Sequence, residues 1–235
     1  MEKKYMLSTE TESVWTNMGY VNAHRIIALV DIPEYGVEVG NIGGFVESET
    51  NLSHEGSCWV FDDACVSGNA CVSGDAIIRD NAMIYGNAKV TDYATVYDTA
   101  RVSGNGTVGG EAYIHDNAHV CGEAVVDGTA KIHGTATVCA NASIHSNSDV
   151  FWFNAPIRER WGKTTADTFY RCADGIARVY SMDSDFCMKM HDYAKCACDS
   201  WKGGDPAVYD ALINFIKCHM KLTDAEIGIV ENTNN

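Results

Sequence analysis

Basic residues are scarce in this sequence. Its 235 residues include 17 Lys and Arg against 32 Asp and Glu, which gives a formal net charge of -15. Proteins that bind the phosphate backbone of nucleic acids need clustered Lys and Arg side chains. We therefore expect no nucleic acid among the partners of this protein.

Long apolar segments are missing as well. The run from Ile26 to Val30 is far shorter than the roughly 20 apolar residues that cross a bilayer as a helix. The first residues, Met1-Glu2-Lys3-Lys4, lead into polar sequence and not into the apolar core of a signal peptide. These features predict a cytoplasmic protein without membrane contact, located in the host cytoplasm if the gene belongs to a phage.

Cysteine is not scarce, but its positions do not indicate a disulfide framework. Several of the 10 cysteines occupy repeat positions where other repeats carry Ser, Thr or Ile, so we expect reduced thiols. Cys121 and Cys139 are expected to be neighbours that stay thiols. A second group fits no common zinc pattern and is expected on one amphipathic helix, without a metal: Cys187, His191, Cys196 and Cys198.

A six-residue period runs through the middle of the chain. Every sixth residue from Val60 to Val150 is Val or Ile, and the residue four places after each, as far as Ser148, is Ala, Gly or Ser. This period fits no α-helix, whereas a short strand followed by a tight turn has it. The β-branched residue then points inward, Ala fills the corner, and Gly, Asp or Asn supplies the strained backbone angles of the turn.

An eighteen-residue period lies on top of the first. One corner column reads Asp62, Asp80, Asp98, Asp116, and the next reads Gly68, Gly86, Gly104, Gly122. Such columns indicate three hexads per coil, with coils about 4.8 Å apart. The sequence thus predicts an all-β core, a left-handed parallel β-helix of about five coils over residues 56–151.

This [Val/Ile]-x-[Gly/Asp]-[Asn/Thr/Glu]-Ala-x repeat resembles that of the hexapeptide-repeat (left-handed β-helix) transferase superfamily. The entry segment Gly40-Asn41-Ile42-Gly43-Gly44-Phe45-Val46-Glu47-Ser48-Glu49, with Asn51-Leu52-Ser53, is similar to the opening of the YdcK-like proteins of bacteria and phages. The resemblance implies a homotrimer and, for an active member, acyl-CoA in the groove between subunits and a catalytic His near an extruded loop. No loop interrupts the hexads here, which argues against catalysis.

The segments on either side of the repeats are expected to cap the β-helix. Residues 1–55, with the β-rich stretch 21–30, predict an N-terminal β cap over the first coil. Residues 152–235 predict a C-terminal α+β cap, in which 168–171 and 176–180 flank the hairpin signal Ala173-Asp174-Gly175. Helices are expected near 185–199 and from Asp205 onward, where Pro206 follows the N-cap.

Outward residues of one face of the β-helix form an aromatic strip. An exposed apolar strip usually contacts another surface, so we expect subunit or cap packing there. A ligand is the alternative, since Arg79, Tyr97, His115 and His133 can grip a planar or anionic group. The strip consists of Trp59, Ile77, Thr95, Tyr113 and Lys131, beside Phe61, Arg79, Tyr97, His115, His133 and Phe151.

Two further features of the coils bear on chemistry. His115 and His133 are weak candidates for a catalytic base, because the repeat spacing does not place an acidic partner beside either histidine. His119 and His145, on the other faces, carry less weight. The aspartate column places carboxylates about 5 Å apart, which predicts raised pKa values or a bound cation such as calcium. Bonding of each Asp to its own turn backbone explains the column without a metal, and we expect none.

Together these features favour a non-catalytic binding or interaction protein on a rigid scaffold, with no cofactor. One form of this hypothesis is a phage accessory or anti-defence protein that binds a protein partner or sequesters a small molecule. The alternative is an acyl-CoA-dependent acyltransferase that uses acetyl-CoA, with His115 or His133 as the base. A purely structural spacer is a third interpretation.

Overall fold

The computed structural model describes residues 3–16, 19–146, 150–160, 163–171, 177–181 and 186–189, and several residues between 210 and 226. Beyond residue 146, side chains are described only for Tyr170 and for those last few residues. Within the described chain, no helix has the length and apolar character that crossing a membrane requires.

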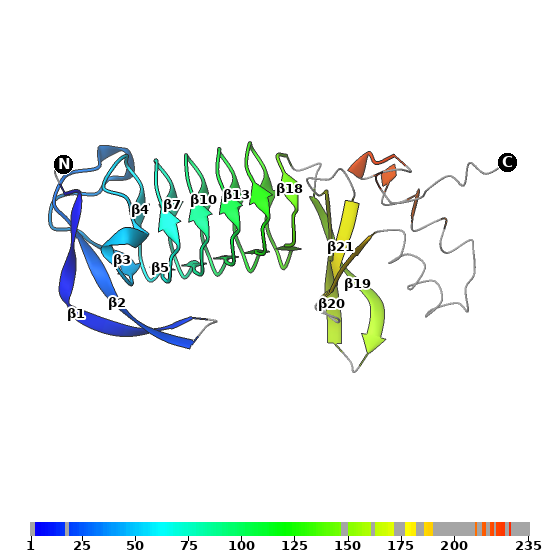
Figure 1. Cartoon of the computed structure of the whole chain (residues 1–235), viewed down its shortest axis with the longest axis horizontal. Coiled ribbons are helices and arrows are strands. Elements are labelled where there is room, and N and C mark those ends of the chain that lie inside the picture. Colours follow the sequence, from blue (N-terminus) through cyan, green and yellow to red (C-terminus); the bar gives the residue numbers. More distant parts are fainter. Residues whose placement is uncertain are drawn as a thin grey trace.

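Short parallel strands wind into a three-sided β-solenoid, whose coils follow one another along the long axis in Figure 1. One sheet has the strand order β16-β13-β10-β7-β4, the second β18-β15-β12-β9-β6, and the third runs through β5-β8-β11-β14-β17. The strands are β4 (Trp59–Val60), β5 (Cys65–Val66), β6 (Cys71–Val72), β7 (Ile77–Ile78), β8 (Met83–Ile84), β9 (Lys89–Val90), β10 (Thr95–Val96), β11 (Arg101–Val102), β12 (Thr107–Val108), β13 (Tyr113–Ile114), β14 (His119–Val120), β15 (Val125–Val126), β16 (Lys131–Ile132), β17 (Thr137–Val138) and β18 (Ser143–Ile144).

The eighteen-residue register is confirmed. Val96 pairs in parallel with Ile78 on one side and with Ile114 on the other, and the same offset holds in all three sheets. The all-β core and its coil length are therefore as the sequence predicts, whereas the handedness of the coil stays a prediction.

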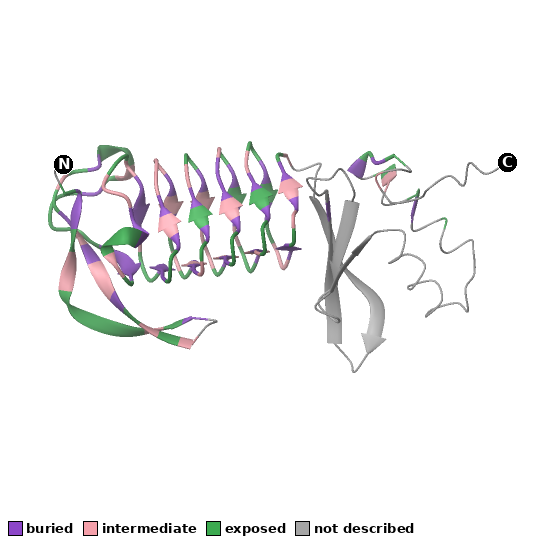
Figure 2. Cartoon of the chain, viewed as in Figure 1, coloured by how far each residue is buried: buried purple, intermediate pink, exposed green. Residues whose placement is uncertain are grey.

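The inward Val and Ile side chains form one continuous core. Ile78, Val96 and Ile114 have no exposed surface, and the Ala residues at the corners, such as Ala94, are equally buried. Figure 2 shows this as buried segments that recur on every coil. Each buried Val or Ile contributes about 1.5 kcal/mol or more, so this stack is the main favourable term in folding.

Residues with positive φ turn the corners of each coil. Ordinary L-residues disfavour this conformation, whereas Gly and, less often, Asp tolerate it. At Gly110, with φ of 60°, an added Cβ would also lie 2.7 Å from the backbone N of Gly128 in the next coil. The three columns are Asp62, Asp80, Asp98, Asp116 and Gly134; Gly68, Gly86, Gly104, Gly122 and Ala140; and Gly56, Gly74, Asp92, Gly110 and Gly128.

The N-terminal segment extends one sheet of the solenoid. β1 (Tyr5–Thr16) and β2 (Gly19–Ala28) form an antiparallel hairpin, and β2 pairs with β3 (Ile42–Val46), which lies parallel to β5. The 3-10 turn η1 (Pro33–Tyr35) lies between β2 and β3, and η2 (Glu49–Asn51) lies between β3 and the first coil strand, β4. A parallel bridge between Leu52 and Val72 adds, with β3, most of a sixth turn.

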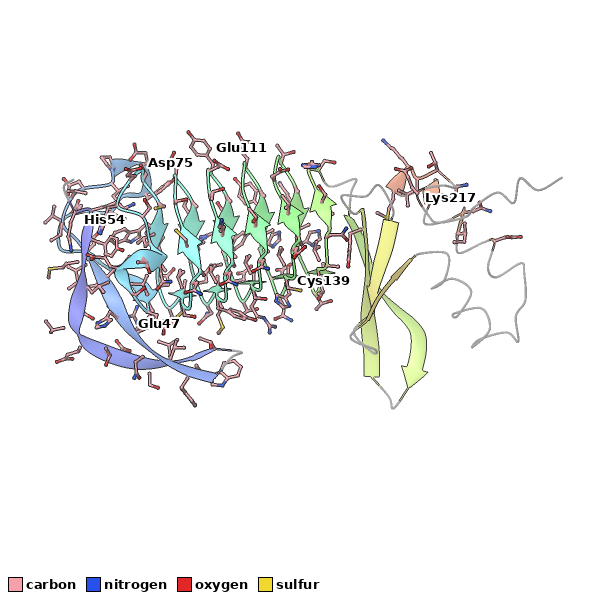
Figure 3. All side chains as sticks on the ribbon, in the orientation of Figure 1. Glu47, His54, Asp75, Glu111, Cys139 and Lys217 are labelled. Carbon is pink, nitrogen blue, oxygen red and sulfur yellow. The ribbon has the colours of Figure 1, made fainter. Side chains whose placement is uncertain are left out.

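Tyr5 closes the open end of the first coil. Its ring meets Trp59 edge-on at 6.4 Å, and its hydroxyl donates to the carbonyls of Glu49 at 3.0 Å and Leu52 at 2.8 Å. Lys4 is buried beside it, with Nζ 2.8 Å from the carbonyl oxygen of Cys58. His54, which Figure 3 labels at this end, stacks on the Tyr5 ring at 4.4 Å. The first coil is therefore covered and not an open edge.

An antiparallel sheet follows the coils. It has the order β19-β20-β21-β22, with β19 (Val150–Arg160), β20 (Lys163–Arg171), β21 (Ala177–Ser181) and β22 (Phe186–Lys189). Arg171 pairs with Ala177, so the hairpin between β20 and β21 is confirmed. Tyr170 from β20 reaches the last coils, where its hydroxyl lies 3.3 Å from Sγ of Cys139, which Figure 3 labels.

The helix expected near 185–199 is wrong at its start. Residues Phe186–Lys189 form β22, because pairing with β21 outweighs local helical preference. Cys187 thus lies on a strand, and the other members of the weighed zinc group, His191, Cys196 and Cys198, fall outside the described residues. In the second expected helix, the described residues with α-helical backbone are Asp210, Ile213, Asn214, Lys217, Cys218 and Met220.

The described cysteines are thiols. Cys121 and Cys139 are both thiols, and Cys58 and Cys65 are buried among core residues. Burial raises the pKa of the Cys65 thiol to about 12, which makes it a poor nucleophile.

Candidate functional site

One corner of the solenoid carries a continuous row of stacked side chains. Each member directly follows an inward residue of the sheet β16-β13-β10-β7-β4, as Arg79 follows Ile78 and Tyr97 follows Val96. Since the inward residues are paired coil to coil, the residues after them must also lie one above another. We call Arg79, Tyr97, His115 and His133 the stacked row.

The members of the stacked row touch face to face. The Arg79 guanidinium lies 4.7 Å from the centre of the Tyr97 ring. Tyr97 and His115 are 4.9 Å apart with planes 9° from parallel, and His115 and His133 are 5.3 Å apart at 14°. The ring faces therefore contact one another. The edges of the rings and of the guanidinium, which carry the hydrogen-bonding groups, face solvent.

A second, shorter stack runs beside the row on the same sheet. The Nζ of Lys131 lies 5.5 Å from the centre of the Tyr113 ring, and Tyr113 is 41% exposed. Ile77 and Thr95 continue this line and are half-buried. From Arg79 to His133, the residues of the strip therefore lie stacked on one another, and their role as a ligand or subunit surface stays a prediction.

The strip is shorter than expected at both ends. Trp59 is only 1% exposed, because the N-terminal cap packs Tyr5 against it, and Phe61 is half-buried against the core. Phe151 lies in β19, opposite Phe169 in the antiparallel sheet, and not on a sixth coil. Residues 59 and 151 fit the period of the repeat in the sequence. In the structure, however, the N-terminal cap covers Trp59, and Phe151 belongs to the C-terminal sheet.

The aspartate column next to the row serves the backbone of the neighbouring coil. The N–H of Asp98 donates to Oδ2 of Asp80 at 3.2 Å, that of Asp116 to Asp98 at 3.0 Å, and that of Gly134 to Asp116 at 2.8 Å. We expected bonds within each turn; the carboxylates instead cap N–H groups one coil further along. The Gly134 N–H, helped by the charge of His115, lowers the pKa of Asp116. The expectation of a raised pKa is therefore wrong for this residue.

His115 has an acidic neighbour that spacing did not reveal. Its Nδ1 lies 3.5 Å from Oδ2 of Asp116, and the His115 side chain is 23% exposed. Asp98, His115 and Asp116 bring one potential ligand atom each to within 4.8 Å of one another, and they are the one such trio among the residues that the structure describes. Because Asp98 and Asp116 are already used as backbone acceptors, the trio needs no metal to explain it.

Partial burial and the neighbouring Asp98 raise the pKa of the Tyr97 phenol. The phenol therefore stays protonated and available as a hydrogen-bond donor. Arg79 has a half-exposed side chain and lies 3.9 Å from Asp80, so its charge is only partly compensated in this exposed place. The row presents donors more than acceptors.

No protein-family model matches the chain, and no curated protein sequence does. The likeness to hexapeptide-repeat proteins therefore rests on the solenoid itself, whose hexads and three sheets are compatible with that repeat.

Sequence reasoning missed a groove on a different face. It lies between the tip of the β1–β2 hairpin and the coils, has a volume of about 270 Å³, and is lined by Trp15, Asn81, Met83, Thr99, Arg101 and Asn117. Arg101 donates to Oδ1 of Asn117 at 3.1 Å, and Trp15 is 53% exposed. The coil residues follow the eighteen-residue period, but nothing in the sequence places Trp15 over them.

Proposed function

We propose that the chain is a binding protein, and that the stacked row, with Lys131 and Tyr113 beside it, is the binding surface. The observation that carries this proposal is the stacking itself, which holds Arg79, Tyr97, His115 and His133 in fixed positions on a rigid scaffold. A surface that is ordered before binding loses little conformational entropy when a partner arrives. No chemical turnover at the row is needed for this role.

The chemistry of the row favours a partner that is rich in hydrogen-bond acceptors. Its ring faces are taken up by stacking, so the exposed edges offer the guanidinium of Arg79, the phenol of Tyr97 and the ring nitrogens of the histidines. Arg79 and Lys131 carry fixed positive charge on a chain whose net charge is -15. A carboxylate or phosphate group on a small molecule or a protein segment satisfies these donors.

A homotrimer and membership of the hexapeptide-repeat superfamily, close to the YdcK-like proteins, are part of the proposal. In a trimer, the row would lie where a neighbouring copy can form the second wall of the binding groove. The regular, exposed face that continues over several coils supports such packing, as does the resemblance of the repeat. A phage accessory role that sequesters an acidic metabolite is one biological form of this function.

Native mass spectrometry of the protein purified gently from cell extract tests the proposal, because it reports the oligomer and any retained ligand together. We expect a bound mass in the wild type and in Lys89→Ala, and its loss in Arg79→Ala. Lys89 is an exposed cation on another sheet, so this control removes the same charge. A charged hydrogen bond contributes about 1.5–3 kcal/mol, or roughly ten- to hundredfold in affinity. Equal retention by all three proteins, or none by the wild type, would contradict the proposal.

The second candidate function is acyl transfer from acetyl-CoA. The contact between His115 and Asp116 favours it, because a catalytic base needs a partner that orients it. A thiol-release assay across amine and sugar acceptors tests this candidate in the wild type, His115→Ala and His133→Ala. Turnover that disappears in His115→Ala would support the enzyme, and the absence of thiol release from the wild type would rule it out for the acceptors used.

A further inference from the structure

Ser143, His145 and Asp127 meet on the last coil of the solenoid. Ser143 Oγ lies 3.0 Å from Nε2 of His145, and Nδ1 of the same ring is bonded to Oδ1 of Asp127. The fold produces this contact in two ways. Ser143 and His145 flank the buried Ile144, so both project outward, and Asp127 precedes His145 by one coil of eighteen residues.

The atoms are connected in the order that nucleophilic catalysis by serine requires. One ring nitrogen faces the hydroxyl and the other faces a carboxylate, which fixes the ring and favours the tautomer with the proton on Nδ1. That tautomer leaves Nε2 as the acceptor of the Ser143 proton. The His145 side chain is 61% exposed and that of Asp127 38%, and Ser143 is half-buried, so its hydroxyl is partly open to a substrate.

The backbone adds a hydrogen-bond donor beside the nucleophile. In the same sheet, the N–H of Lys89, Thr107 and Val125 each donate to a carbonyl of the following coil, at 2.8 to 2.9 Å. Ser143 holds the next place in this series, on the terminal strand β18. Among the residues that the structure describes, no acceptor receives the Ser143 N–H. An unused N–H on the nucleophilic residue itself is a donor for a developing oxyanion.

We propose that Ser143, His145 and Asp127 form an esterase site, independent of the stacked row, with Ser143 as nucleophile, His145 as base and Asp127 as positioning residue. The substrate class is esters of short aliphatic acids. Val125 pairs directly with Ser143 on the neighbouring strand and is 37% exposed, so it offers an apolar surface for a short acyl chain.

The proposed reaction has two halves. Ser143 Oγ bonds to the ester carbonyl carbon while its proton passes to His145 Nε2, and the bond to the leaving alcohol then breaks as the alcohol takes that proton. Water attacks the acyl-serine in the same manner, with His145 as base, and releases the carboxylic acid and the free serine. The sum is ester plus water giving acid plus alcohol, so no other reactant is needed.

The chain contains a matched comparison. Ser103 Oγ lies 2.8 Å from Nε2 of His119, a pair with the same spacing as a nucleophile and base. Ser103 is 6% exposed, and burial, followed by the charge of Arg101, lowers the pKa of His119 to about 4. No carboxylate is bonded to His119 in the described chain. This pair has the hydroxyl and the imidazole, but among the described residues it has no carboxylate that orients the imidazole, and its buried hydroxyl is not accessible to a substrate.

The experiment uses p-nitrophenyl acetate with the full-length protein. Release of p-nitrophenol is followed together with intact mass, and the acetylated residue is located by peptide mapping. We expect acetyl-Ser143 in the wild type and in Ser103→Ala, and none at this position in Ser143→Ala. In His145→Ala, the rate of acetylation at Ser143 should fall by about a hundredfold, the scale of general-base catalysis. The thermal melt of His145→Ala should match the wild type, since this side chain is 61% exposed, and melts of the two serine variants show whether they stay folded.

The conservative variant Asp127→Glu separates a positioning role of Asp127 from a structural one. Asp127→Asn removes the carboxylate bonded to the His145 ring, so the acetylation rate at Ser143 should fall, and Asp127→Glu should restore part of that rate. Acetylation of Ser143 that is no faster than that of Ser103, or that does not change in His145→Ala, would overturn the proposal. Neither result alters ligand retention at the stacked row, so the two proposals fail separately.

Discussion

Among single residues, two glycines differ in how closely their surroundings approach them: Gly106 at a corner of the coils and Gly44 in β3. Gly106 stands where the other coils carry Ala, for example Ala88 and Ala124, which are fully buried at the corner. Gly44 in β3 is different, because an added Cβ would lie 2.7 Å from the carbonyl oxygen of Ala64 and 2.7 Å from a Val60 methyl group. The same substitution should therefore cost much less at Gly106 than at Gly44.

We expect Gly106→Ala to change the free energy of unfolding by less than about 1 kcal/mol, because the lower entropy of the unfolded chain offsets the tight approach of the added Cβ, 3.0 Å from the carbonyl oxygen of Ser103. Gly44→Ala should destabilise by about 1–3 kcal/mol, because backbone on two sides must shift. Denaturant unfolding of both variants beside the wild type measures this difference. Equal destabilisation by the two would mean that the corner environment of residue 106 is not that of the other coils.

His119 should make stability depend on pH. Its folded-state pKa is lowered to about 4, chiefly by burial and then by Arg101, whereas an unfolded histidine titrates near 6.5. Below pH 6.5 the unfolded chain binds a proton at His119 that the folded chain does not bind. The contribution of His119 to the free energy of unfolding is therefore complete above pH 6.5 and is lost as the pH falls toward 4. The loss is on the order of 3 kcal/mol.

The variant His119→Gln removes this titration and retains a polar partner for Ser103. Free energies of unfolding for wild type and variant, measured at pH 8 and pH 4.5, should show a clearly smaller acid loss in the variant. Parallel losses in the two proteins would show that His119 does not titrate between those values.

At the element scale, the caps decide which strip residues are available. The period places Trp59 outward, yet the β1 strand brings Tyr5 over it, and a contact between residues so far apart in sequence has no local signal. The hairpin of β20 and β21 was predictable because its turn residues are adjacent, whereas β22 was not, because its pairing with β21 depends on tertiary contacts.

The capping role of Tyr5 has a direct test. Tyr5→Phe removes the hydroxyl that donates to two carbonyls and should cost about 1–2 kcal/mol. Tyr5→Ala should cost about 3–5 kcal/mol and also expose the first coil, which favours association at high concentration. Tyr20, 74% exposed at the tip of the hairpin, provides the control, as Tyr20→Ala should leave unfolding unchanged. Calorimetry and light scattering distinguish these outcomes, and a Tyr5→Ala variant as stable as the control would remove the capping role.

At the scale of the whole molecule, regularity explains what could be predicted. The solenoid and the row from Arg79 to His133 follow from a period that is visible in the sequence, because stacked coils turn sequence spacing into spatial contact. Asp127 and His145 are also eighteen residues apart, but spacing alone does not predict their bond, since side-chain orientation decides it. The groove beside Trp15 and the cover of Trp59 depend on how the cap folds back, which no period records.

Residues eighteen apart lie directly above one another in the solenoid. Nuclear Overhauser effects between aromatic protons measure this in protein labelled only at Tyr and His. Stacking predicts strong cross-peaks between Tyr97 and His115 and between His115 and His133, whose rings are 4.9 and 5.3 Å apart, assigned through Tyr97→Leu and His133→Gln. Assigned resonances for these rings with no cross-peaks between them would contradict the stacking on which the row depends.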